Sequence, residues 1–347
     1  MKQKTILVTG GAGFIGSNFA HHIYHTYPEY KIIVLDALTY AGNVENLPVK
    51  ENNDRFEFWY GNIKNADLVE ALISRSDIIV HFAAETHVSR SIFDGREFFE
   101  TDVMGTHTLI NAALKHQNTI DRFIHISTSE VYGTAETESM DEDHPLNPMT
   151  PYAAAKAGAD RLVYSYWKTF GLPVTIVRPF NNYGPRQHLE KAIPRFITSC
   201  LLGEKITLHG NGSAARDYIH VEDTCRAISE IIHADIEKVQ GEVFNVATDR
   251  HISMIDIAKT IIDNVPNTPG VRSYSFSFIN DRPGQVERHT GNIEKIKKIL
   301  GWEPVIDFET GIQGVIGWYV TNRPWWEPQT WMRSVEIMAK DGEKERY

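Results

Sequence analysis

The segment Thr9-Gly10-Gly11-Ala12-Gly13-Phe14-Ile15-Gly16 decides the fold of this 347-residue chain. It follows a short apolar run, residues 6–9, and leads into a helix-length stretch, residues 13–27. In such a strand–loop–helix unit, regularly spaced glycines allow a tight turn and let a pyrophosphate approach the backbone at the positive end of the helix. The segment therefore predicts a dinucleotide-binding loop. The loop residues that we expect to contact the cofactor are Gly10, Gly13, Phe14, Ile15 and Gly16.

A carboxylate stands at the end of the second apolar run. Asp36 directly follows residues 32–35 and comes 20 positions after Gly16. A carboxylate at this place accepts hydrogen bonds from the hydroxyls of an adenosine ribose, and it repels a 2′-phosphate. The sequence therefore predicts that the cofactor is NAD and not NADP.

Short apolar runs alternate with longer amphipathic stretches through the first half of the chain. The expected strands are residues 6–9, 32–35, 56–59, 78–82, 123–127 and 174–178. The expected helices are residues 13–27, 66–75, 101–116 and 152–170. This order is typical of an α/β fold with a Rossmann-type, doubly wound parallel sheet. Loop signals become frequent after Pro179, so we expect an NAD-binding domain over residues 1–179 and a smaller C-terminal substrate-binding lobe over residues 180–347, partly interleaved with the first.

The composition argues against several classes of function. Asp and Glu together number 45 against 35 Lys and Arg, a net charge of -10, whereas nucleic-acid binders more often carry a basic surplus. No apolar run approaches the roughly 18 residues that span a bilayer, and the first run is too short for a signal peptide. We therefore expect neither a nucleic-acid nor a membrane partner, and a cytoplasmic location.

Two further features of the composition concern cysteine and tryptophan. Cys200 and Cys225 show no metal-like or redox spacing, so we expect two buried thiols in a reducing compartment and no bound metal. The last residues, 324–347, are first aromatic and then highly charged. We expect them to form a surface tail packed by three tryptophans, with a subunit contact as the alternative.

The sequence Tyr152-Ala153-Ala154-Ala155-Lys156 places a phenol and an ammonium group on one face of a helix. An ammonium group beside the phenol is expected to lower the pKa of Tyr152, so that a phenolate takes a hydroxyl proton while a hydride leaves the same carbon. Just upstream, an expected strand ends in Ser127-Thr128-Ser129-Glu130. Ligands bind at the carboxyl ends of such strands. We therefore expect Thr128 to donate to a substrate hydroxyl and Glu130 to be an additional acid or base.

The glycine spacing and the Tyr152–Lys156 pair resemble the extended short-chain dehydrogenase/reductase family. The resemblance includes Gly61-Asn62-Ile63, which it implies is near the adenine, and His81-Phe82-Ala83-Ala84, which it implies lies along the nicotinamide ribose. Lys156 is implied to hold that ribose as well. The further NAD contacts implied in this way are Asn62, Ile63, Ala83, Ala84, Tyr152 and Lys156.

Five more motifs narrow the resemblance to dTDP-glucose 4,6-dehydratases and their nucleotide-sugar relatives. These motifs are residues 85–91, 181–185, 190–194, 216–218 and 281–284, and the similarity covers about residues 4–320. It implies a nucleotide-diphosphate sugar as substrate, with Asn181 and Arg216 at its phosphates, Lys191 nearby and Thr86 as a further contact. It also implies a homodimer that pairs the helices at residues 101–116 and 152–170. The residues expected to offer apolar surface on the second helix are Leu162, Tyr164 and Trp167.

The resemblance implies a 4,6-dehydration that yields a nucleotide-bound 4-keto-6-deoxyhexose. Tyr152 removes the C4 hydroxyl proton as a hydride passes to NAD, Glu130 takes the C5 proton, water leaves from C6, and the hydride returns to C6. The dTDP-glucose enzymes usually have an Asp where this chain has Ser129, and that Asp is the group held to protonate the leaving hydroxyl. Either Glu130 carries the C5 proton across to the C6 oxygen, or Ser129 positions a water that does so.

The sequence departs from the dTDP-glucose dehydratase motifs at other positions too, and alternative functions remain open. Ser89 and Asp102 replace the usual Asp and Asn, so neither the nucleotide nor the sugar is specified, and an N-acetylhexosamine stays possible. A UDP-glucuronate decarboxylase shares Thr-Ser-Glu, although Asp281-Arg282-Pro283-Gly284 is closer to the dehydratases. A 4-epimerase has no use for a C5 base. A non-catalytic NAD-sensing scaffold commonly loses the Tyr or the Lys of the pair, and this chain keeps both.

Overall fold

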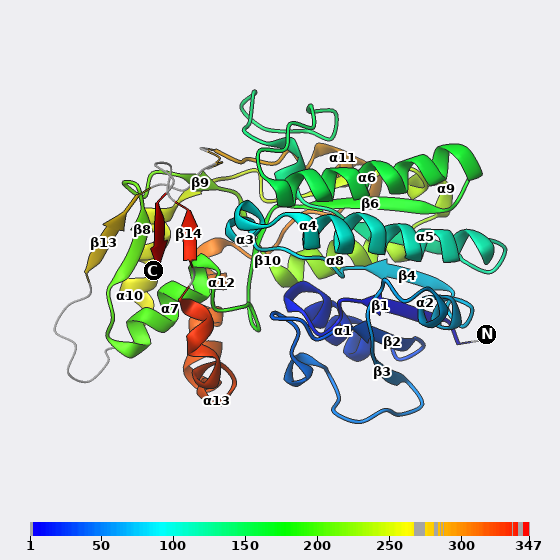
Figure 1. Ribbon diagram of the computed structural model, residues 1–347, viewed down its shortest axis with the longest axis horizontal. Coiled ribbons are helices and arrows are strands. Elements are labelled where there is room, and N and C mark those ends of the chain that lie inside the picture. The colour runs from blue at the N-terminus through cyan, green and yellow to red at the C-terminus, as the bar shows by residue number, and fades with distance from the viewer. Residues whose placement is uncertain are drawn as a thin grey trace.

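The computed structural model describes residues 3–266, 275–280, 284, 286, 288–334, 336–338 and 343–346. A seven-stranded sheet with the order β11-β6-β5-β4-β1-β2-β3 occupies one half of the molecule, and all of its pairings are parallel (Figure 1). Its strands are β1 (Thr5–Thr9), β2 (Lys31–Asp36), β3 (Phe56–Tyr60), β4 (Ile78–His81), β5 (Arg122–Ile126), β6 (Val174–Pro179) and β11 (Val243–Val246). The Rossmann-type fold class predicted from the sequence is confirmed.

Both faces of the sheet are covered by helices, which is why most of its strands are almost continuously apolar. In β1, Ile6 and Val8 pack into one core and Leu7 into the other. The first core lies under α1 (Phe14–Thr26), α8 (Val221–His233) and α11 (Glu294–Leu300). The second lies under α2 (Ala66–Ile73), α5 (Thr106–Lys115) and α6 (Pro151–Phe170).

The chain returns to the first sheet late in the sequence. After residue 220, α8 packs against α1, and β11 then pairs with β6. The short helix α9 (Ile236–Val239) connects these two elements. Residues 221–246 therefore complete the sheet that the first half of the chain begins.

The expected helix at residues 101–116 differs from the prediction at its start. The short α4 (Arg96–Phe98) runs into a wide π-type turn, η2 (Phe99–Gly105), and only then into α5. The hydroxyl of Thr106, the first residue of α5, donates to the carbonyl oxygen of Asp102 in η2 at 2.5 Å. Wide turns of this kind often occur at functional sites, and this one buries Asp102 beside the sheet.

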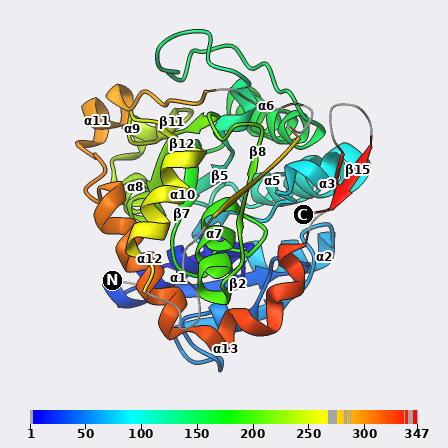
Figure 2. The ribbon, with the colours of Figure 1, turned by 90° about the vertical axis from the view of Figure 1, so that its left-hand side faces the viewer.

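The second lobe packs helices and small sheets around its own apolar core (Figure 2). Three two-stranded sheets belong to this part of the chain: β7 (Asn181–Tyr183) with β10 (Tyr218–His220), β8 (Ile206–His209) with β13 (Phe276–Ile279), and β9 (Ala215–Arg216) with β12 (Ile252–Ser253). Its helices are α7 (Ala192–Leu202), α10 (Met254–Asn264), α12 (Phe308–Thr321) and α13 (Arg323–Trp326). Shorter elements elsewhere are η1 (Val44–Asn46), α3 (Val88–Phe93) and η3 (Ser129–Tyr132).

The expectation of a surface tail packed by three tryptophans is wrong in part. Trp326 is fully buried in the core of the second lobe, and its ring N–H donates to the Tyr319 carbonyl at 2.7 Å. The Trp325 ring N–H donates to Asn46 at 2.8 Å and so joins the two halves of the chain. Trp331, in η4 (Glu327–Arg333), is 65% exposed.

The chain ends in a small hairpin. Strand β14 (Glu336–Met338) pairs antiparallel with β15 (Lys344–Arg346), and this hairpin lies against α3 (Figure 2). Of the helices in the described ranges, none is both long and apolar enough to cross a bilayer.

Candidate functional site

The glycine loop closes against the backbone so tightly that two of its positions exclude any side chain. Gly10 has a φ of +70°, and a Cβ there would lie 2.6 Å from the backbone nitrogen of Ala83. A Cβ at Gly16 would lie 2.3 Å from the carbonyl oxygen of Gly10. Gly13 precedes α1 and, as far as the described residues show, no side chain caps that helix. The loop therefore leaves the positive end of α1 open to a phosphate.

Asp36 lies at the end of β2, next to this loop. One carboxylate oxygen accepts from the Ala12 N–H at 2.9 Å and the other from the Leu38 N–H at 2.8 Å. Burial raises the pKa of Asp36, and these backbone hydrogen bonds oppose the rise. Because each carboxylate oxygen has a further lone pair and the residue lines the cavity, Asp36 fits the two hydroxyls of an adenosine ribose.

We expect Asp36→Ala to weaken NAD binding and to reduce the preference for NAD over NADP. Losing hydrogen bonds to a charged group costs about 1.5–3 kcal/mol, which corresponds to roughly tenfold or more in the NAD dissociation constant. Calorimetric titration of both cofactors measures the effect. Asp36→Asn is the control, because it removes the charge but still accepts from the loop backbone. Equal affinity of the unaltered protein for NAD and NADP would refute the role of Asp36.

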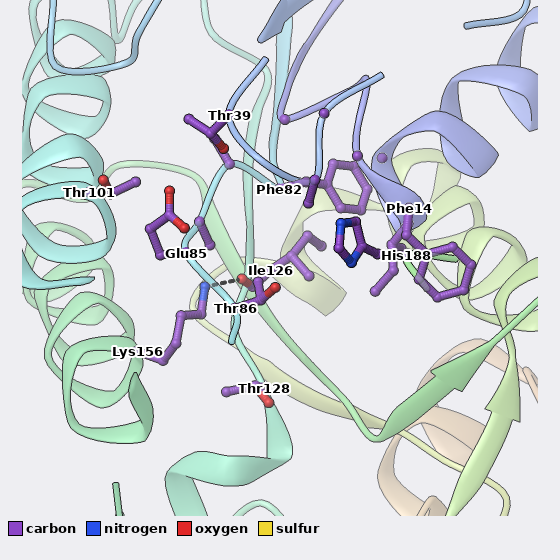
Figure 3. Close-up of a pocket in the computed structure, with 18 of the residues that line it drawn as sticks. Phe14, Thr39, Phe82, Glu85, Thr86, Thr101, Ile126, Thr128, Lys156 and His188 are labelled. Carbon is purple, nitrogen blue, oxygen red and sulfur yellow. Dashed lines mark hydrogen bonds between the residues drawn. The ribbon is translucent and has the colours of Figure 1, made fainter. Parts of the chain in front are cut away.

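The loop opens into a cavity of about 340 Å³ at the carboxyl ends of the strands (Figure 3). All of the predicted cofactor residues and all of the predicted catalytic residues line it. They are Gly10, Gly13, Phe14, Ile15, Gly16, Asp36, Asn62, Ile63, Ala83, Ala84, Thr128, Ser129, Glu130, Tyr152 and Lys156. Thr86, Asn181 and Lys191, predicted to meet the substrate, line the same cavity. The structure thus brings together residues as far apart in the sequence as Gly10 and Lys191.

Tyr152 and Lys156 lie in the first turns of α6. The helix begins where the Thr150 hydroxyl accepts from the Ala153 N–H at 3.2 Å, with Pro151 as its first residue. The Lys156 ammonium group donates to the Ile126 carbonyl oxygen at 2.7 Å, at the end of β5 (Figure 3). Burial lowers the pKa of Lys156, and the nearby Asp102 carboxyl group opposes this shift.

The predicted lowering of the Tyr152 pKa is wrong for the protein without ligands. Burial raises the pKa of Tyr152, and the carboxyl groups of Asp102 and Glu130 raise it further. A hydrogen bond with the Thr128 hydroxyl opposes the rise. The physical reason is that the Lys156 ammonium group is directed at the Ile126 carbonyl, so that the opposing effect on the phenol comes from Thr128.

The segment after β5 turns sharply back over the sheet edge. The Thr128 side chain caps η3 by accepting from the Glu130 N–H at 3.2 Å. Ser129 is buried, whereas Glu130 is half-buried and borders two cavities. Glu130 is thus a carboxylate placed beside Tyr152, as its effect on the Tyr152 pKa also indicates. This arrangement suits a base that removes a proton from a carbon adjacent to the one whose hydroxyl group Tyr152 deprotonates.

A second cavity of about 230 Å³ continues from the first and contains the predicted phosphate contacts. Arg216 lines only this second cavity, while Asn181 and Lys191 border both. The guanidinium group of Arg216 is buried and donates to the Ala215 carbonyl at 2.9 Å. The Lys191 ammonium group donates to the Thr86 carbonyl at 3.1 Å. Asp281, Arg282 and Pro283, which separate dehydratases from decarboxylases in the sequence, lie outside the described residues.

Two carboxyl groups of the site escaped the sequence prediction. Glu190 is buried and lies 3.1 Å from the Nε2 of His87 and 3.7 Å from the guanidinium group of Arg90. Burial raises its pKa. Burial also raises the pKa of Glu85, which lines the first cavity, to about 7, and Glu97 adds to the rise. Glu85 and Glu190 belong to the motifs at residues 85–91 and 190–194, but the sequence does not show that their carboxyl groups are buried or which groups surround them.

The comparisons with known proteins agree on one family. The family described as GDP-mannose 4,6 dehydratase matches residues 7–315. A dTDP-glucose 4,6-dehydratase of Actinoplanes is 40% identical over 92% of this chain and 99% of its own length. A low-salt glycan biosynthesis protein of Haloferax volcanii is 43% identical over 91% of this chain and 98% of its own. The structure of a dTDP-glucose 4,6-dehydratase of Streptomyces venezuelae with NAD bound superimposes with a TM-score of 0.86 at 39% identity, over 93% of this chain and 99% of that one.

Proposed function

Because this chain belongs to the GDP-mannose 4,6 dehydratase family and is an NAD-dependent nucleotide-sugar 4,6-dehydratase, we propose a role in that reaction for each residue of its site. One observation carries the proposal: Tyr152, Glu130 and the glycine loop all line a single cavity. A sugar that reaches Tyr152 with its C4 hydroxyl therefore lies beside both the cofactor loop and a carboxylate. The enzyme is a lyase, because the hydride that leaves the sugar returns to it and only water is lost.

The cofactor is NAD, and the structure offers it a fitting site. The glycine positions that exclude a Cβ leave room for the pyrophosphate at the end of α1, and Asp36 accepts from the ribose hydroxyls. When bound, NAD accepts one hydride from the sugar and later returns it. We propose that Asn62 and Ile63 border the adenine, and that Ala83, Ala84 and Lys156 border the nicotinamide ribose.

Tyr152 is proposed as the base for the C4 hydroxyl. Its phenol is hydrogen-bonded with Thr128, so Thr128 is placed to bind the same sugar oxygen. The hydrogen bond with Thr128 opposes the burial that disfavours the phenolate, and Lys156 lies one turn further along α6. The oxidation at C4 makes the proton at C5 acidic, because the resulting carbanion is conjugated with the new ketone.

Glu130 is proposed as the base for C5. Its carboxyl group borders both cavities and lies beside Tyr152. Ser129, the residue before it, lines the same cavity and is proposed to act on the C6 hydroxyl. Loss of the C5 proton and of the C6 oxygen yields the alkene to which the hydride is returned.

The substrate is a nucleotide sugar, and we propose that its diphosphate lies where the two cavities meet. Asn181 and Lys191 border both cavities and Arg216 borders the second, so Lys191 and Arg216 can neutralise the diphosphate and Asn181 can donate a hydrogen bond to it. Thr86 is proposed as a further sugar contact. On this view the residues after 179 mainly bind the nucleotide sugar and those before it mainly bind NAD, in a cytoplasmic enzyme.

The names of the relatives support a glucose substrate, and dTDP-glucose is the first to test. The experiment incubates the enzyme separately with dTDP-glucose, UDP-glucose, UDP-N-acetylglucosamine, GDP-mannose and UDP-glucuronate and identifies the products by NMR. A C6 methyl signal from one hexose supports the proposal and identifies the sugar and its nucleotide. A five-carbon product from UDP-glucuronate alone would overturn it.

We propose a homodimer through α5, η2 and α6. Tyr164 and Trp167, expected to offer apolar surface, pack partly against the sheet of their own chain. Met104 in η2 and Phe170 at the end of α6 are 57% and 50% exposed and supply apolar surface instead. Light scattering should give about twice the 39.4 kDa mass of one chain, and Met104→Glu should lower it. A mass near 39.4 kDa across micromolar concentrations would contradict the dimer.

A further inference from the structure

A buried histidine stands behind Ser129 and takes no part in the roles proposed above. His289 is completely buried, and its Nδ1 lies 3.4 Å from the Ser129 hydroxyl oxygen. Its Nε2 lies 2.6 Å from the carbonyl oxygen of Gly133, in the turn that follows Glu130. The His289 backbone N–H donates to the Ala215 carbonyl at 3.3 Å, and the ring packs against Phe180. The ring is thus held from several sides.

These contacts determine which nitrogen of the ring carries the proton. A carbonyl oxygen can only accept a hydrogen bond, so the Nε2 of His289 must be the donor. Burial lowers the pKa of His289, although the Glu130 carboxylate opposes the shift, so the ring is neutral at neutral pH. A neutral imidazole has one N–H only, so Nδ1 bears a lone pair. The Ser129 hydroxyl therefore donates its hydrogen to Nδ1.

The orientation of the Ser129 hydroxyl follows. Its hydrogen points away from the cavity toward His289, whereas Ser129 itself lines the cavity. The oxygen lone pairs that remain can only accept a hydrogen bond from a group in the cavity. A serine held in this way receives a hydrogen bond from a sugar hydroxyl and does not supply a proton to it.

We propose that His289 is a positioning residue that holds the Ser129 hydroxyl as an acceptor for the 6-hydroxyl of the sugar, so that the proton lost with the leaving water comes from Glu130. The inference rests on the proposed function. Because Ser129 stands where related enzymes have an Asp, the source of the proton for the leaving 6-hydroxyl was open. The inference selects the route in which Glu130 carries the C5 proton across to the C6 oxygen.

In the elimination, a single proton then passes from C5 to Glu130 and on to the C6 oxygen. The C5–H bond breaks, its proton passes to the Glu130 carboxylate, and its electron pair forms the C5–C6 double bond. The C6–O bond breaks, and the departing oxygen takes the proton from Glu130 and leaves as water. Glu130 is again a carboxylate, and Ser129 has only oriented the 6-hydroxyl so that a lone pair of its oxygen faces Glu130.

Two substitutions at position 289 separate the two hydrogen bonds of the ring. His289→Gln places an amide group near the position of Nε2, so it can still donate to Gly133 but offers Ser129 no acceptor. His289→Asn places an amide group near the position of Nδ1, so it offers Ser129 an acceptor but loses the donor to Gly133. The rate of elimination should therefore fall more in His289→Gln than in His289→Asn.

The decisive kinetic measurement combines Ser129→Ala with His289→Gln. Each single change should lower the rate of elimination by roughly two- to tenfold, the effect of losing one hydrogen bond between neutral groups. Neither should change the rate of C4 oxidation, because Ser129 contacts the 6-hydroxyl and not the C4 hydroxyl. The double variant should be no slower than Ser129→Ala, because His289 acts only through Ser129. The proposal would be overturned if the fold-losses of the two single variants multiplied in the double variant. It would also be overturned if the rate of C4 oxidation fell as much as the rate of elimination.

An activity-independent measurement keeps this inference distinct from the proposed function. The nitrogen-15 NMR shifts of His289 in the full-length protein should report a neutral ring protonated at Nε2, and Ser129→Ala should move the Nδ1 signal. A ring protonated at Nδ1, or a signal indifferent to Ser129→Ala, would contradict the pairing. If the pairing holds and no nucleotide sugar is dehydrated, the proposed function fails and the Ser129–His289 contact stands.

Discussion

Glu130→Gln is expected to stop formation of the 4-keto-6-deoxy sugar while still allowing the sugar to be oxidised at C4. Glutamine has nearly the same size as glutamate but cannot accept a proton at neutral pH. Removing a positioned general base typically lowers a rate by about 10²–10⁴-fold. Because Tyr152 and Lys156 are unaltered, addition of the substrate should still reduce part of the bound NAD, visible as NADH absorbance. The C6 methyl signal should be absent from the NMR spectrum.

Glu130→Asp is the matched control for this change. It retains a carboxylate at the second residue of η3, on a side chain that is one methylene shorter. This variant should therefore retain partial turnover. A Glu130→Gln enzyme with full dehydratase turnover would place the C5 base elsewhere. Such a result would also remove the basis for assigning the elimination to the Thr128–Glu130 segment.

Tyr152→Phe is expected to fail one step earlier, before any NADH appears. The change removes the phenol oxygen from a buried ring and leaves the ring itself in place. Without this oxygen the C4 hydroxyl loses its base, so the oxidation that starts the cycle should slow by about 10²–10⁴-fold. Stopped-flow absorbance after mixing with substrate distinguishes the two variants: NADH forms in Glu130→Gln and does not form in Tyr152→Phe.

Thr128→Val is the control for Tyr152→Phe, because it removes the hydrogen bond with the phenol but leaves the phenol. It should slow C4 oxidation less than Tyr152→Phe does. Rapid NADH formation in Tyr152→Phe would show that another group takes the C4 proton. Such an outcome would refute the proposed role of the Tyr152 phenol.

Much of the fold could be predicted from the sequence because the signals are local. Several of the six predicted strands are nearly all apolar, as strands covered on both faces are, and each of the six is found within two residues of its expected bounds. The glycine loop was equally clear, because a strand, a tight turn and a helix follow one another directly in the sequence. The residues at strand ends then fall together, because parallel strands present their carboxyl ends at one edge.

What the sequence could not show depends on contacts between distant segments. The seventh strand, β11, pairs with β6 although more than sixty positions separate them. His289 is 160 positions from Ser129, and no local pattern connects the two. The environment of Tyr152 was also beyond prediction, because burial and the carboxyl groups of Asp102 and Glu130, which come from other segments of the chain, raise its pKa. The buried Trp326 likewise owes its place to packing within the second lobe.

The most direct test of the dehydration follows the hydrogen atoms of the sugar through one turnover. The hexose that the enzyme accepts, labelled with deuterium at C4, is incubated with the unaltered enzyme in ordinary water, and the product is identified by NMR. A 4,6-dehydratase must give a ketone at C4 and one deuterium in the C6 methyl group. Deuterium found again at an inverted C4 would identify a 4-epimerase. A five-carbon product with released carbon dioxide would identify a decarboxylase, and either result would contradict the proposed function.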